Sequence, residues 1–220
     1  MLAPILLFSM VAHEYAHGYA ALRQGDDTAL RAGRLTWNPL KHIDPFLTVV
    51  LPVMMFLTLG VAFGGAKPVP VDPRLYRNYR RGDIIVSLAG VTVNLILAVL
   101  LTGVIILLGL LGRAVPGVAS SLALLQLMFV FGVTINLLLA IFNLLPIPPL
   151  DGSHVVKHFL PPAWAIRYQR LAGAGFLVLV LLILFGRPVI NAWLAPVFFL
   201  ARVAQGVFAP FLLPTAWAPT

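Results

Sequence analysis

The stretch "IIVSLAGVTVNLILAVLLTGVIILLGLLG", residues 84–112, contains no charged side chain. About 20 apolar residues are enough for a helix to cross a bilayer, so this stretch can span on its own. Residues 114–150 form a second uncharged run, and residues 1–12 are apolar as well. Runs of this length predict an all-α, polytopic, integral membrane protein.

The composition agrees with a membrane location. Hydrophobic residues make up 60% of the chain and charged residues 10%, whereas soluble domains carry about 25% charged residues. The net charge of +8 favours basic loops that face the cytoplasm and anionic lipids. It does not favour a nucleic-acid binder, because basic and aromatic residues are not interleaved. The chain has no cysteine, which excludes disulfides and thiolate metal sites.

Hydropathy and turn residues predict about five to six membrane segments in one domain. We expect a functional core over residues 1–156 and further membrane segments of the same domain over residues 157–220. The N-terminal segment is interpreted as a retained helix, because it lacks the basic start and cleavage site of a signal peptide. The alternation in "LRAGRLTW" predicts a short β-hairpin at the membrane face, within residues 27–40. The expected membrane segments are residues 1–22, 45–66, 84–112, 119–145, 171–186 and 189–213.

Residues 45–66 are expected to form a re-entrant or broken segment. Pro52 lies near their middle and glycines lie at their end, and broken helices are tolerated at membrane depth where protein buries them. If this segment turns back, the basic loops on either side of it share one face with the basic residues of 157–170. Arg113 and Arg187 then remain on the opposite face, which is the arrangement that the positive-inside rule favours.

The motif "HEYAHG" places costly side chains inside the first apolar segment. His13 and His17 are four residues apart, so on a helix their rings lie one turn apart on the same face. Glu14, the only glutamate of the chain, is rotated to one side. This is the HExxH arrangement, in which two histidines bind zinc and the glutamate is the general base. Two helix-packing histidines are the simpler alternative, but ionisable groups within a membrane are functional by default.

A catalytic zinc ion commonly has three protein ligands, and two histidines with one carboxylate are a known set. Asp151 is the favoured third ligand, because it ends the uncharged run 114–150 in the turn-forming context "PPLDG". The alternative role for Asp151 is to cap the following helix. If residues 45–66 turn back, Asp151 and the HExxH motif lie at the same face of the membrane. The other candidates are His42, Asp44, His154 and His158.

Three asparagines lie within the long uncharged runs 84–112 and 114–150. Asn94 and Asn143 could donate hydrogen bonds to a substrate backbone or to a developing oxyanion. Asn136 is seven residues before Asn143 and equally fits an interhelical hydrogen bond. His154, one turn beyond Asp151, could support the metal site or lie at the surface.

The motifs "HEYAHG", "AGVTVN" and "NLLPIPPLDG" together resemble the site-2 protease family of intramembrane zinc metalloproteases. The connecting text "GRLTWNPLKHIDP" and "GGAKPVPV" resembles the compact bacterial branch without a PDZ domain. The resemblance covers about residues 10–156. Members often have Gly-Pro where this chain has Val91 and Thr92 after Gly90 in "AGVTVN".

The resemblance implies one Zn²⁺ ion held by His13, His17 and Asp151, with Glu14 as the catalytic acid/base. Asn94 and Asn143 match family asparagines near the active site. The implied activity is regulated intramembrane proteolysis, the cleavage of transmembrane segments of membrane-anchored proteins after a first cut by another enzyme. Anti-sigma-factor-like regulators are an implied substrate class. The implied location is the bacterial cell membrane, with the active site toward the cytoplasmic side.

Two other classes of protein fit part of the pattern. A metal transporter or metal-binding membrane protein would also place histidine and aspartate between helices, but it has no need of Glu14 beside the first histidine. A structural membrane scaffold would need none of these groups. Replacing Glu14 with glutamine distinguishes a protease from a transporter, because only the protease depends on the general base.

Overall fold

A computed structural model describes residues 2–59 and 64–214 of the chain, and it contains helices but no strand within these ranges. Short 3₁₀ or π-helical turns link several of the helices. The helices are α1 (Leu2–Gln24), α2 (Thr28–Arg31), α3 (Leu51–Leu59), α4 (Tyr79–Ala114), α5 (Ala119–Asn143), α6 (Asp151–Val156), α7 (Pro162–Arg170), α8 (Ala172–Phe185) and α9 (Arg187–Phe208).

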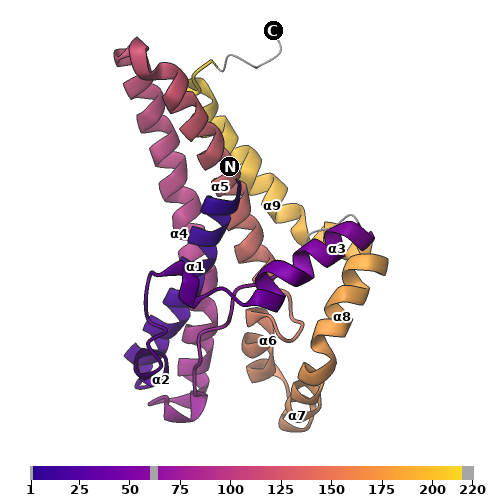
Figure 1. The fold of residues 1–220 in the computed structure, drawn as a ribbon. Helices are drawn as coiled ribbons and strands as arrows, with labels where there is room; N and C mark the ends of the chain where they lie inside the picture. Colours follow the sequence, from indigo (N-terminus) through magenta and orange to yellow (C-terminus); the bar gives the residue numbers. More distant parts are fainter. Residues whose placement is uncertain (1, 60–63, 215–220) are drawn as a thin grey trace.

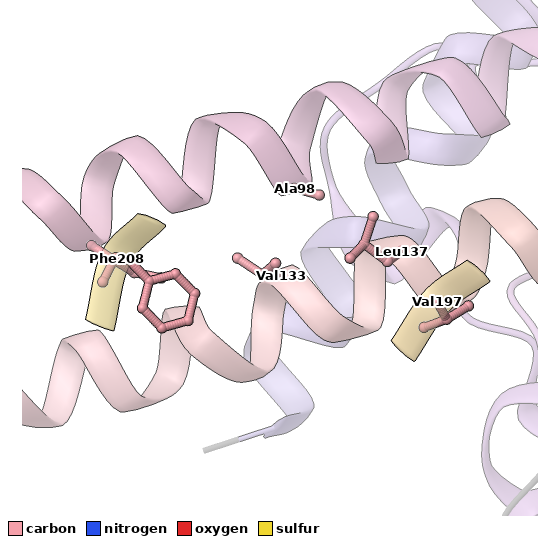
Figure 2. Close-up of a cluster of buried hydrophobic side chains, with 6 residues drawn as sticks. Ala98, Val133, Leu137, Val197 and Phe208 are labelled. Atoms are coloured by element: carbon pink, nitrogen blue, oxygen red, sulfur yellow. The ribbon is translucent and has the colours of Figure 1, made fainter. Parts of the chain in front are cut away.

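The centre of the molecule is a bundle of long helices. Helix α4 packs against α5 and α1, and α9 packs against α5 (Figure 1). Figure 2 shows the hydrophobic core that α4, α5 and α9 share. The core residues are Ala98 and Ile105 on α4, Val133 and Leu137 on α5, and Val197 and Phe208 on α9.

The outer faces of these helices remain strongly apolar. Val99 and Leu107 of α4 are 72% and 65% exposed, and Phe199 of α9 is 66% exposed. Such surfaces are unfavourable in water and suit contact with lipid tails. The apolar exterior, together with the long apolar helices, defines an integral membrane protein.

The structure does not support the expected count of five to six membrane segments. By length and composition, the described residues contain three candidate spans, or four if α7 and α8, which are bent by 75°, count as one. Helix α1 is 23 residues long but is not among them, because His13, Glu14 and His17 lower its hydropathy. The three spans are Tyr79–Ala114, Pro116–Asn143 and Arg187–Phe211.

The segment expected to be re-entrant contains a short helix, and the chain after it returns to the start of the segment. The helical part, Pro45–Thr58, is shorter than a bilayer requires. Thr48 donates a hydrogen bond to the Gly65 carbonyl at 2.8 Å, and the Gly65 N–H donates to the Leu47 carbonyl at 3.1 Å. These bonds place residues 47 and 65 side by side, so the loops before and after the segment lie on one side of the molecule. Gly60, at the end of the segment, lies outside the described residues.

The predicted β-hairpin within residues 27–40 is wrong. Asp26 is fully buried, and its Oδ1 accepts hydrogen bonds from the backbone N–H and the hydroxyl of Thr28. These bonds start a helical turn, α2, which Gly33 ends with a φ of 62°, a conformation that glycine adopts at low cost. Local hydrogen bonds between a side chain and the backbone therefore override the alternating pattern that suggested a strand.

Candidate metal centre

The two histidines of the HExxH motif meet on α1 as helix geometry requires. The Nε2 atoms of His13 and His17 are 3.0 Å apart. Helix α4 crosses α1 at this level, and a Cβ atom at position 90 would stand 2.5 Å from His17 Nε2. Real Cβ atoms do not approach other atoms so closely, so only glycine at position 90 allows this helix crossing.

Asp151 reaches the same point from a distant part of the sequence. Helix α5 ends at Asn143, and the proline-containing turn after it ends where Asp151 begins α6. Gly152 makes this close turn possible, because a Cβ there would lie 2.1 Å from the Leu144 carbonyl oxygen. Asp151 Oδ2 lies 3.2 Å from His13 Nε2 and 3.3 Å from His17 Nε2.

The three ligand atoms fit a zinc ion. Tetrahedral zinc with bonds of about 2.0–2.1 Å holds neighbouring ligand atoms about 3.3 Å apart, close to the separations of 3.0, 3.2 and 3.3 Å. Asp151 Oδ2 is buried and has no hydrogen-bond partner within the described residues. A buried carboxylate oxygen without a donor is costly, and a cation at this point would stabilise it. The side chains of His13, His17 and Asp151 are only 10%, 12% and 19% exposed.

The outer nitrogen of each imidazole has a fixed partner. His17 Nδ1 lies 2.7 Å from the Val86 carbonyl oxygen, and His13 Nδ1 lies 2.5 Å from Asn94 Oδ1. A carbonyl oxygen only accepts, so His17 must carry its proton on Nδ1 when the ring is neutral. The Nε2 lone pair of His17 then faces the other ligand atoms. Partners of this kind orient metal-binding histidines in zinc proteins.

Glu14 is held by the loop that follows the short apolar helix. Its Oε2 accepts a hydrogen bond from the backbone N–H of Val69 at 2.7 Å. Val69 stands between Pro68 and Pro70, which have no N–H, so it supplies the only backbone donor of that tripeptide. The loop approaches α1 closely, since a Cβ at Gly18 would lie 3.0 Å from Val69 Cγ1.

The other candidate ligands lie in different contacts. Asp44 caps the turn that begins at Pro45, by accepting from the N–H groups of Phe46 and Leu47. His42 is 1% exposed, and its Nε2 contacts the Thr36 carbonyl at 2.9 Å. His154 and His158 both lie beside Asp83 of α4. The structure therefore brings Asp151 to the histidine pair and none of these four residues.

The asparagines differ in their surroundings. Asn94 is fully buried, and both ends of its amide are engaged, Oδ1 with His13 and Nδ2 with Asn136. Asn143 donates to the Leu139 carbonyl of its own helix. The contacts of Gly90 and Val69 are not predictable from the sequence, because both depend on how separate segments cross. The motifs "AGVTVN" and "GGAKPVPV" were the signals that contained them.

The helical bundle has an apolar outer surface, and the HExxH histidines meet a buried carboxylate inside it. These two features together define a membrane-embedded zinc metalloprotease. The model of Peptidase family M50 matches residues 1–186, and the chain belongs to this family. The resemblance to the site-2 proteases is thus confirmed. Zinc is the metal that the names of the relatives imply.

Two relatives show how far the likeness extends. "Putative zinc metalloprotease YwhC" of Bacillus subtilis (strain 168) is 36% identical over 212 residues, which cover 94% of this chain and 92% of the relative. "Putative zinc metalloprotease Rip2" of Mycolicibacterium smegmatis (strain ATCC 700084 / mc(2)155) is 35% identical over 187 residues, covering 85% of this chain and 67% of the relative. No solved structure gives a significant match to the chain.

Proposed function

We propose that His13, His17 and Asp151 hold one zinc ion and that Glu14 is the general acid/base of an intramembrane endopeptidase. The substrates are transmembrane segments of membrane-anchored proteins, including regulators of the anti-sigma-factor kind, cut after a first cleavage elsewhere. The observation that carries the proposal is the set of three ligand atoms separated by 3.0–3.3 Å, with Glu14 beside the first histidine.

Side chains and backbone groups of the protein have separate roles in the proposed hydrolysis. A bound zinc ion supplies a Lewis acid that polarises the scissile carbonyl and lowers the pKa of a water to about 7. Glu14 takes a proton from the attacking water and passes it to the leaving amine. The Val69 N–H holds Oε2 of Glu14 and leaves Oε1 available for that proton. Asn143 lies at the end of α5, seven residues before the turn residue Leu150, and remains our candidate donor to the oxyanion.

The location of the site supports cleavage near the cytoplasmic face. Asp151 and the HExxH motif meet at the side of the molecule where the basic loops lie, and those loops are cytoplasmic under the positive-inside rule. A substrate helix satisfies its backbone hydrogen bonds internally, so it must unwind locally before its carbonyl can reach the site. Residues that weaken the substrate helix near this face should therefore favour cleavage.

The test uses the purified full chain in proteoliposomes with a single-span model substrate that carries a glycine or proline near its cytoplasmic end. Wild type should bind one zinc ion per chain and cleave the substrate. Glu14→Gln should keep the zinc and lose cleavage, whereas His17→Ala should lose both. Zinc-loaded wild type that leaves every such substrate intact would contradict the proposal, as would cleavage by Glu14→Gln.

The same vesicles test the transporter alternative. A metal transporter would carry zinc into them, and Glu14→Gln would change that uptake little. Under our proposal no protein-dependent uptake occurs, and the function of Glu14 appears only in the cleavage assay.

A further inference from the structure

A continuous series of hydrogen bonds leads from His13 through α4 and α5 back to Ser9 and Ile5, one and two turns earlier on the same face of α1. His13 Nδ1 lies 2.5 Å from Asn94 Oδ1, Asn94 Nδ2 donates to Asn136 Oδ1 at 2.8 Å, and Asn136 Nδ2 donates to Ser9 Oγ at 2.9 Å. Ser9 Oγ in turn donates to the Ile5 carbonyl at 2.8 Å. Ser9, Asn94 and Asn136 are all 0% exposed. The series joins α1, α4 and α5 within the core.

The far end of this series fixes the direction of every bond in it. The Ile5 carbonyl can only accept, so the Ser9 hydroxyl donates there and its oxygen accepts from Asn136. The second N–H of Asn136 donates to the Gly132 carbonyl at 2.8 Å. Both hydrogens of that amide are thus used, and its oxygen must face Asn94. Asn94 therefore donates toward Asn136 and presents its own oxygen to His13.

This direction decides which nitrogen of His13 carries the proton. An amide oxygen opposite Nδ1 requires a proton on Nδ1, which leaves the lone pair of the neutral ring on Nε2. Nε2 is the atom 3.2 Å from Asp151 Oδ2. If the Asn94 amide turned over, its NH₂ group would face Nδ1, the proton would move to Nε2, and His13 could not bind a metal through that atom.

We propose that Asn136 and Ser9 are positioning residues of the zinc centre, which set the tautomer of His13 through Asn94. The inference rests on the proposed role of His13 as a zinc ligand. Neither Asn136 nor Ser9 contacts the metal centre directly. They act by removing the second orientation of the Asn94 amide, which would otherwise compete with metal binding.

A second buried amide supplies a matched control. Gln126 of α5 is 1% exposed and also joins helices, because its Nε2 donates to the carbonyls of Ile105 and Phe211 and its Oε1 accepts from Leu213 N–H. All its partners are backbone groups. Gln126 therefore contributes to helix packing alone, whereas the series of hydrogen bonds from Ser9 ends on the imidazole ring of His13.

The experiment measures zinc affinity by competition with a chelating dye, and thermal unfolding, on the purified full chain in detergent. Asn136→Leu should weaken zinc binding about tenfold to hundredfold, as loss of outer partners does in other zinc sites. Ser9→Ala should weaken it less, since Asn136 keeps its bond to Gly132. Gln126→Leu should lower the unfolding temperature and leave zinc affinity as in wild type.

A rescue variant separates tautomer control from simple packing. An ionised aspartate at position 94 can only accept, so it fixes the proton on His13 Nδ1 whatever stands at position 136. The double variant Asn94→Asp/Asn136→Leu should regain zinc affinity to within a few-fold of wild type while its unfolding temperature stays low. Unchanged affinity in Asn136→Leu and Ser9→Ala would overturn the inference, as would an equal loss in Gln126→Leu. Wild type that binds no zinc would overturn the proposed function instead.

Discussion

Gly90 of α4 stands directly against the imidazole of His13, so that a Cβ at position 90 would lie 2.5 Å from the ring atom Cε1. The same face of α4 carries the other groups that define the metal centre. Asp83 contacts the segment after α6, the Val86 carbonyl orients His17, and Asn94 orients His13. These residues follow one another at intervals of three or four along the helix, so they form one stripe. One face of helix α4 therefore positions the residues of the candidate metal centre.

The contact of Gly90 predicts that Gly90→Ala abolishes zinc binding. The added methyl must displace both rings or push α4 away from α1, and either change separates the ligand atoms. Zinc content and thermal unfolding of the purified variant are the measurements. Gly103→Ala in the same helix is the control, because a Cβ there meets nothing within 4 Å. It should bind zinc normally and be stabilised by up to about 1 kcal/mol through helix propensity. Normal zinc binding by Gly90→Ala would contradict the helix crossing described above.

The N–H of Val69 predicts a backbone-specific effect on catalysis. Val69→Pro removes the donor to Glu14 and should lower kcat about tenfold to hundredfold, the worth of one hydrogen bond to a charged group. Zinc affinity should not change, since Val69 contacts none of the three ligands in the described structure. Val69→Ala keeps the N–H and loses only side-chain packing, so its kcat should stay near that of wild type. Equal losses in the two variants would assign the effect to packing instead.

The ion pairs of Asp83 with the residues after α6 are expected to hold the segment that carries Asp151 against α4. Asp83 Oδ2 lies 2.6 Å from both Lys157 Nζ and His158 Nε2, and its side chain is 4% exposed. Asp83→Asn leaves Lys157 without its counter-charge, which costs about 3–5 kcal/mol for a buried pair. The unfolding temperature and the zinc affinity should both fall. The double variant Asp83→Asn/Lys157→Gln should recover part of the loss, and strictly additive effects would contradict direct pairing.

The absence of cysteine from the chain permits a clean test of sidedness. Single cysteines at Arg74, whose side chain is 87% exposed, and at the exposed Gly117 lie in loops at opposite ends of α4. A membrane-impermeant maleimide added to intact cells should label Gly117→Cys only. Inside-out vesicles should reverse the result. Labelling of both positions from one side would show that α4 does not cross the membrane, and labelling of Arg74→Cys in intact cells would overturn the proposed orientation.

Local features were predictable from the sequence, because they depend on neighbours along the chain. Helix geometry alone requires His13 and His17 to share a face, and the uncharged runs indicate α4 and α5. Asp151 could be singled out because a carboxylate after a long apolar run needs a partner.

Features that depend on the crossing of distant segments were not predictable. The apposition of Gly90 and the imidazoles follows from the angle at which α4 meets α1, and the bond from Val69 to Glu14 follows from the path of a proline-rich loop. The predicted hairpin failed because buried Asp26 accepts hydrogen bonds from Thr28, the first residue of a helical turn, and its burial is not visible in a local pattern. The expected number of membrane segments is not supported, because polar groups lower the hydropathy of α1 and because the apolar helix Pro45–Thr58 is short.

His17 and Asp151 are far apart in the sequence, and this separation determines when the metal centre can form during biosynthesis. The ribosome delivers α1 first, with its two histidines and glutamate, and the carboxylate follows only after α4 and α5 have been made. A nascent chain therefore carries Glu14 through most of its insertion without a complete ligand set. Under the proposed function, hydrolytic competence therefore arrives late in translation.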